Sequence, residues 1–109
     1  HKPEAQRKFD FHEVYPGLFL GRQPRSESDI AVLHKQGVRS VVSVIQPWEL
    51  YIPDLRDCCA HSGMELLILP TPDAQPPSQE AIGDALFFIE ENLSRGSVFV
   101  HCNAGVGRS

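Results

Sequence analysis

At 109 residues, with 41% hydrophobic and 22% charged residues, the chain has the composition of one small folded domain rather than of a disordered segment. Its formal net charge of −4 disfavours a broad nucleic-acid-binding face, so we expect no nucleic acid among its partners. No apolar run approaches the roughly 18 residues that a membrane helix needs, and no signal-peptide pattern opens the sequence.

Four short apolar runs predict strands, in chain order at residues 18–21, 38–45, 65–71 and 97–101. The run VRSVVSVI at 38–45 is β-branched and almost continuous, which is typical of a strand that is covered on both faces. The segment QPWELYIP that follows it is bounded by prolines, and it predicts a loop or the start of a short helix.

Three helices are predicted between these strands, at residues 26–36, 53–61 and 78–95, and glycines mark their ends. In the second helix, Leu55 and one of the two adjacent cysteines, Cys58 or Cys59, are expected to face inward. The third helix is the clearest, because apolar residues recur in it at three- and four-residue steps: Ile82, Ala85, Leu86, Ile89 and Leu93.

Strands that alternate with helices at this spacing predict an α/β fold with a mainly parallel central sheet flanked by helices. The last predicted strand runs directly into the terminal segment HCNAGVGRS. Open α/β sheets place their binding sites at the carboxyl ends of their strands, so this segment is the candidate site.

The three cysteines do not form a disulfide framework, since adjacent Cys58 and Cys59 are poor partners for each other and the count is odd. Such usage favours a reducing compartment, either the cytoplasm or another intracellular one. No ligand spacing typical of a metal site is present, so we expect no metal.

The terminal segment combines residues that suit the binding of a phosphoryl group. Gly105 and Gly107 allow successive backbone amides to turn inward around an anion, and Arg108 brings a planar fork that can hold two oxygens. A thiol at Cys102 beside such a cradle should ionise below its usual pKa of about 8.5. The alternative is a buried structural cysteine next to a turn.

The pattern His-Cys-x-x-Gly-x-Gly-Arg-Ser resembles the signature of cysteine-dependent dual-specificity protein phosphatases, and the likeness extends over most of the chain. The motifs PTPD and HCNAGVGRS resemble laforin, a glucan phosphatase, whereas QPWELYIP and PPSQEAIGDALFFIEEN resemble the mitochondrial phosphatidylglycerophosphate phosphatases. The resemblance implies that residues 1–109 are the N-terminal two-thirds of one catalytic domain, which lacks the C-terminal helices after the signature loop.

The resemblance also assigns roles to individual residues, and it implies a reaction that needs no cofactor. Cys102 would be the nucleophile and Asp73, 29 residues before it, the general acid, although a Pro-Asp turn is the simpler interpretation of Asp73 alone. Ser109 would stabilise the leaving thiolate, and His101 would tune the pKa of Cys102 or simply be a buried strand-end histidine. Arg108 and the amides of the loop would hold the phosphate: Asn103, Ala104, Gly105, Val106, Gly107 and Arg108.

The resemblance leaves the substrate open: a phosphorylated protein, a small phosphomonoester, a glucan or a phospholipid. The uncharged residues Asn103, Ala104 and Val106 disfavour a polyphosphorylated lipid. Trp48 and Tyr51 are either the wall of a pocket or packing that caps the core.

Two rival functions remain, a phosphate-recognising scaffold without turnover and a rhodanese-like sulfurtransferase. The chain begins with His1 and ends at Ser109, so we expect weak or absent activity of this piece alone, or a second chain that completes the domain. Core packing is the preferred interpretation of Cys58 and Cys59, and a protective disulfide to the nucleophile is the alternative.

Overall fold

The computed structural model describes residues 9–71 and 77–102. Within these ranges the elements follow one another in this order: β1 (Phe11–Tyr15), β2 (Leu18–Gly21), α1 (Glu27–Lys35), β3 (Val38–Val44), the 3-10 turn η2 (Pro47–Glu49), α2 (Leu55–His61), β4 (Glu65–Leu69), α3 (Gln79–Leu93) and β5 (Ser97–Cys102).

The strands form one five-stranded sheet in the order β1-β2-β5-β3-β4, in which the last four are parallel and β1 is antiparallel to β2. This confirms the predicted α/β fold with a mainly parallel sheet. Strand β1 was not predicted. The signal for it is the dipeptide Pro16-Gly17 before the apolar run Leu18–Gly21, where Gly17 takes the positive φ of 83° that the hairpin turn requires.

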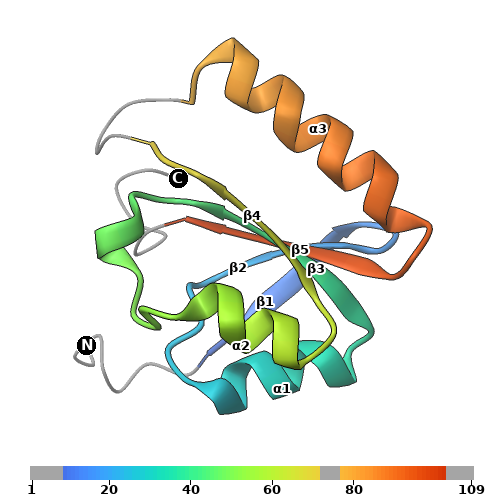
Figure 1. Cartoon of the computed structure of the whole chain (residues 1–109). Coiled ribbons are helices and arrows are strands. Elements are labelled where there is room, and N and C mark those ends of the chain that lie inside the picture. Colours follow the sequence, from blue (N-terminus) through green and yellow to red (C-terminus); the bar gives the residue numbers. More distant parts are fainter. Residues whose placement is uncertain (1–8, 72–76, 103–109) are drawn as a thin grey trace, which may run out of the picture.

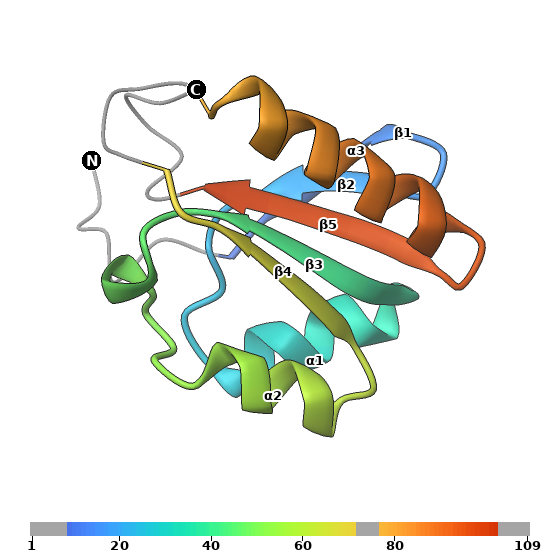
Figure 2. The ribbon, with the colours of Figure 1, turned by 45° about the horizontal axis from the view of Figure 1, so that its top comes forward.

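Helices cover both faces of the sheet, with α1 and α2 on one side and α3 on the other (Figures 1 and 2). The larger core lies under α1 and α2, where Ile30, Leu33, Leu55 and Phe99 are fully buried. Strand β3 lies in the middle of these layers and is buried along most of its length, as the continuous run predicted.

The predicted helices form: α2 ends at His61 as predicted, and the other boundaries lie one or two residues inside the predicted ones. Ser78 caps α3 as expected, because its Oγ accepts a hydrogen bond from the Ala81 N–H at 3.0 Å. The second helix begins at Leu55 rather than at residue 53.

The face of α3 that meets the sheet differs from the predicted stripe. Ala85, Ile89 and Leu93 do pack on the sheet, together with Phe88, but Ile82 and Leu86 are exposed, as is Phe87. Apolar residues of α3 extend beyond the packed stripe, since Phe87 and Phe88 are adjacent and only Phe88 meets the sheet, so the periodicity alone did not select the face. Strand β4 is half-buried rather than buried because it is the edge of the sheet.

Among the residues that the structure describes, no helix has the length and apolar character needed to span a bilayer.

Candidate active site

The candidate site lies at the edge where the parallel strands end. Cys102 is the last residue of β5, and β5 is the central strand between β2 and β3. In the sheet register Val44 pairs with Cys102 on one side and with Leu69 on the other. The C-terminal ends of β5, β3 and β4 therefore lie side by side at one edge of the sheet (Figure 2).

His101, the residue before the cysteine, is held by a hydrogen bond within the sheet. Its side chain is 2% exposed, and its Nε2 lies 2.6 Å from Oγ of Ser43, the residue that pairs with it on β3. The imidazole also stacks on Phe99, with ring centroids 5.8 Å apart and planes 28° from each other. A buried ring with these two contacts has a fixed orientation, as expected for a side chain that positions a neighbouring thiol.

Ser43 is a residue that the sequence analysis missed. It is completely buried in β3, and a serine inside an otherwise β-branched strand was the available signal that a polar partner lies opposite. No sequence pattern identified His101 as that partner, because the two residues are 58 positions apart.

Most of the predicted site residues fall outside the described residues. This applies to the predicted acid Asp73 and to the predicted phosphate-binding loop with Ser109: Asn103, Ala104, Gly105, Val106, Gly107 and Arg108. Of Cys102 the structure describes the backbone, as the final residue of β5. Asp73 follows the end of β4 by four residues, and buried Thr71 lies between them and donates its Oγ1–H to the Leu69 carbonyl at 2.9 Å.

The aromatic residues of the segment after β3 do not cap the core. Trp48 is 78% exposed and Tyr51 is also exposed, so that interpretation is wrong. The other interpretation, the wall of a pocket, stays a prediction.

Cys58 and Cys59 lie at the other end of the strands. Cys59 is buried in the core, which confirms the packing interpretation, and burial raises the pKa of its thiol to about 12. Burial, followed by the carboxylates of Glu27 and Asp54, also raises the pKa of Cys58. Both thiols are therefore poor nucleophiles at neutral pH.

The sheet register also argues against a disulfide between Cys59 and the nucleophile. The Cys59 carbonyl accepts from the Met64 N–H, next to the Ser40 end of β3, whereas Cys102 pairs with Val44. Four residues of strand amount to about 13 Å. A disulfide requires Cα atoms within about 7 Å.

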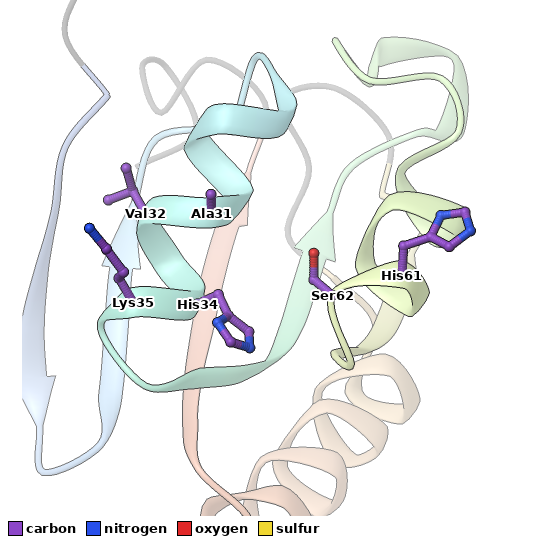
Figure 3. Close-up of a pocket in the computed structure, with 6 residues that line it drawn as sticks. All are labelled: Ala31, Val32, His34, Lys35, His61 and Ser62. Atoms are coloured by element: carbon purple, nitrogen blue, oxygen red, sulfur yellow. The ribbon is translucent and has the colours of Figure 1, made fainter.

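An open groove lies between the C-terminal ends of α1 and α2 (Figure 3). Six residues line it: Ala31, Val32, His34, Lys35, His61 and Ser62. Within residues 9–71 and 77–102, no three histidine, cysteine or acidic side chains gather in a way that could hold a metal. The ends of α1 and α2 precede the starts of β3 and β4, whereas Cys102 ends β5, so the groove is not part of the candidate site.

Known proteins match this chain over most of its length. A family model described as "Tc-R-P: Polymorphic toxin system, DSP-PTPase phosphatase" matches residues 19–109. The chain is 36% identical over 96 residues to phosphatidylglycerophosphate phosphatase PTPMT1 of Arabidopsis thaliana, an alignment with 84% of this chain and 27% of that protein. It is 26% identical over 117 residues to laforin of Mus musculus, with 91% of this chain and 36% of that protein.

The fold also matches solved structures. A crystal structure of Tk-PTP in its active form superposes with a TM-score of 0.71 at 30% identity, over 84% of this chain and 60% of that one. The chain spans less than half the length of the Arabidopsis phosphatidylglycerophosphate phosphatase and of mouse laforin. These two relatives belong to the two groups that the sequence motifs indicated.

Proposed function

The chain belongs to the DSP-PTPase phosphatases, and on this premise we propose that it hydrolyses phosphomonoesters through a phosphocysteine intermediate. The observation that carries the proposal is the position of Cys102 at the end of the central strand, directly after a buried histidine held by Ser43. A nucleophile on a rigid element keeps its reacting atom in place, which accounts for a large part of catalysis.

In the first step, the Cys102 thiolate attacks phosphorus, forming a bond between Sγ and phosphorus as the bond to the leaving oxygen breaks. Asp73 gives its proton to that departing oxygen. Arg108 and the amides of residues 103–108 hold the three equatorial oxygens while charge develops on them.

In the second step, water attacks the phosphocysteine, Asp73 accepts a proton from the water, and Sγ leaves as a thiolate that the Ser109 hydroxyl stabilises. His101 acts by positioning the backbone and thiol of Cys102 rather than by touching the substrate. Two features support the role of Asp73: its position four residues after β4, and the register that brings the end of β4 next to the end of β5 through Val44.

We propose a phosphorylated protein or a small phosphomonoester as substrate, in a reducing intracellular compartment. The free thiol of Cys58 and the buried thiol of Cys59 support such a compartment.

The experiment is phosphate release by the chain from an aryl phosphate and from an alkyl phosphate, beside Cys102→Ser and Asp73→Ala. We expect Cys102→Ser to abolish turnover and Asp73→Ala to reduce it by about 10² to 10⁴-fold. The loss on Asp73→Ala should be larger for the alkyl phosphate, because an alkoxide needs the proton more than a phenolate does. A folded chain that binds vanadate but releases no phosphate, either alone or with the C-terminal helices of a relative appended, would overturn the proposal in favour of a phosphate-binding scaffold.

A further inference from the structure

The side of α3 that is turned away from the sheet combines an aromatic ring with negative charge. Phe87 is 65% exposed there, whereas its neighbour Phe88 packs on the sheet. Side chains three and four positions apart are neighbours on the surface of a helix, so Phe87 lies among Asp84, Glu90 and Glu91. Helix α3 contains no lysine or arginine that could neutralise these carboxylates. These four residues, Phe87 and the three acids, form the acidic face of α3.

The groove between the C-terminal ends of α1 and α2 has the opposite charge. It has a volume of about 560 Å³, and Ala31 and Val32 give it an apolar part. The other long side chains that line it are the basic residues of the two last helical turns, His34, Lys35 and His61. Figure 3 shows Lys35 and His61 on either side of His34. None of the described residues that line the groove is acidic, so it suits an apolar side chain flanked by carboxylates.

The acidic face and the groove lie on opposite sides of the molecule. Helix α3 covers one face of the sheet, and α1 and α2 cover the other (Figures 1 and 2). The two surfaces therefore cannot meet within one chain, but they can meet between two copies of it. A contact between two different surfaces leaves a free groove at one end of the pair and a free acidic face at the other.

We propose that copies of this chain associate head to tail, with Phe87 of one copy seated in the groove between α1 and α2 of the next. The ring then packs on the apolar part of the groove, and the carboxylates around it face the basic side chains. A volume of about 560 Å³ lies in the range of small-ligand pockets and is ample for one phenyl ring.

Charge selects this contact over the symmetric ones. Two acidic faces brought together would oppose carboxylate to carboxylate around each Phe87, and two grooves would oppose basic residue to basic residue. Only the pairing of an acidic face with a groove is attractive. The contact uses none of the residues of the candidate active site, so it is independent of the proposed function.

The association should be weak. The groove is open, and a single aromatic side chain anchors the contact, so we expect a dissociation constant between about 10 μM and 1 mM. Charges that meet at the edge of such a contact are sensitive to salt, because the screening length falls from about 30 Å at 0.01 M to about 3 Å at 1 M.

Sedimentation equilibrium of the full chain over this concentration range tests the proposal. At low salt the average mass should rise with concentration past that of a dimer, because each added copy leaves one groove and one acidic face free. Raising the salt to about 1 M should lower the average mass at each concentration.

Two variants block the two surfaces separately. Phe87→Ala removes the anchor and Lys35→Glu reverses a charge of the groove, and each should weaken association at least about tenfold. Both residues are exposed, so circular dichroism should show both variants folded. An equimolar mixture should form dimers and nothing larger, because the intact groove of the first variant receives the intact acidic face of the second. Tyr15→Ala is the matched control, since Tyr15 is 64% exposed but lies on β1, and it should associate like the unmodified chain.

Three results would overturn the proposal. The first is a chain that stays monomeric up to about 1 mM at low salt. The second is association that Phe87→Ala weakens and Lys35→Glu does not, which would indicate a symmetric contact between two copies of α3. The third is a mixture of the two variants that stays monomeric.

Discussion

Replacing Ser43 by alanine tests whether the buried hydrogen bond to His101 holds the site together. The hydroxyl lies 2.6 Å from Nε2 of His101, and both side chains are almost inaccessible to solvent. Removing the hydroxyl leaves the imidazole nitrogen buried without this partner. A buried polar group left in that state costs about 1–3 kcal/mol. For a domain of this size each kcal/mol lowers Tm by about 4–8 °C.

The chain supplies a matched control for this change. Ser40 lies on the same strand and is also completely buried, but its Oγ has no hydrogen-bond partner in the described structure. Ser40→Ala removes a hydroxyl that gains nothing from burial, so its Tm should be unchanged or higher. Thermal unfolding followed by circular dichroism measures both, and a fall of at least about 4 °C is expected for Ser43→Ala alone.

Activity separates a positioning role from a purely structural one. At a temperature where both variants are fully folded, Ser43→Ala should lower kcat and move the pH dependence of Cys102 alkylation, while Ser40→Ala should change neither. If the two variants unfold at the same temperature and alkylate with the same pH profile, the hydrogen bond does not hold the site and the reasoning from it is refuted.

Three further predictions concern packing, capping and ionisation. Gly21→Ala should destabilise the fold strongly, because the new Cβ would lie 2.5 Å from Cβ of Phe11. Gly83→Ala has open space around it in α3 and should stabilise the fold by about 0.5–1 kcal/mol. Urea unfolding of both variants measures the difference. Ser78→Ala should cost about 1 kcal/mol in the same assay, since it removes the acceptor for the Ala81 N–H. Folding raises the pKa of Cys59 from 9.0 to about 12, so above pH 9 the thiol ionises in the unfolded chain before it does in the folded one. The free energy of unfolding should therefore fall above pH 9 by up to about 1.4 kcal/mol per pH unit, and Cys59→Ala should lack this contribution. An equal pH dependence of the two proteins would contradict the burial of this thiol.

The sequence predicted the elements of this fold well where the local signal is strong and unambiguous. The β-branched run became β3, and Ser78 became the cap of α3, because each depends on interactions within a few residues. Strand β1 was missed because it is short and mostly exposed, with a burial pattern that gives no clear alternation. The face of α3 was not predictable, since its choice depends on which residues of the sheet lie opposite.

The candidate site shows the same division between local and long-range information. Its chemistry could be predicted because the cysteine and the residues that follow it form one contiguous pattern, which the family resemblance made specific. The hydrogen bonds that hold the site could not be predicted, because they join residues that are far apart in the sequence. Ser43 and His101 are 58 residues apart, and Gln23 and Tyr51 are 28 residues apart. No local pattern encodes which strands become neighbours.

The sheet order explains why those two long-range contacts act on the same place. Strand β5 lies between β2 and β3, so each segment that leaves a neighbouring strand begins beside the end of β5. From β3 come Ser43, which anchors the histidine before the nucleophile, and the turn with Trp48; from β2 comes Gln23, which fixes that turn. A substitution in the turn or at Gln23 should therefore leave the register of β5 intact, because the strand keeps its pairing with β2 and β3.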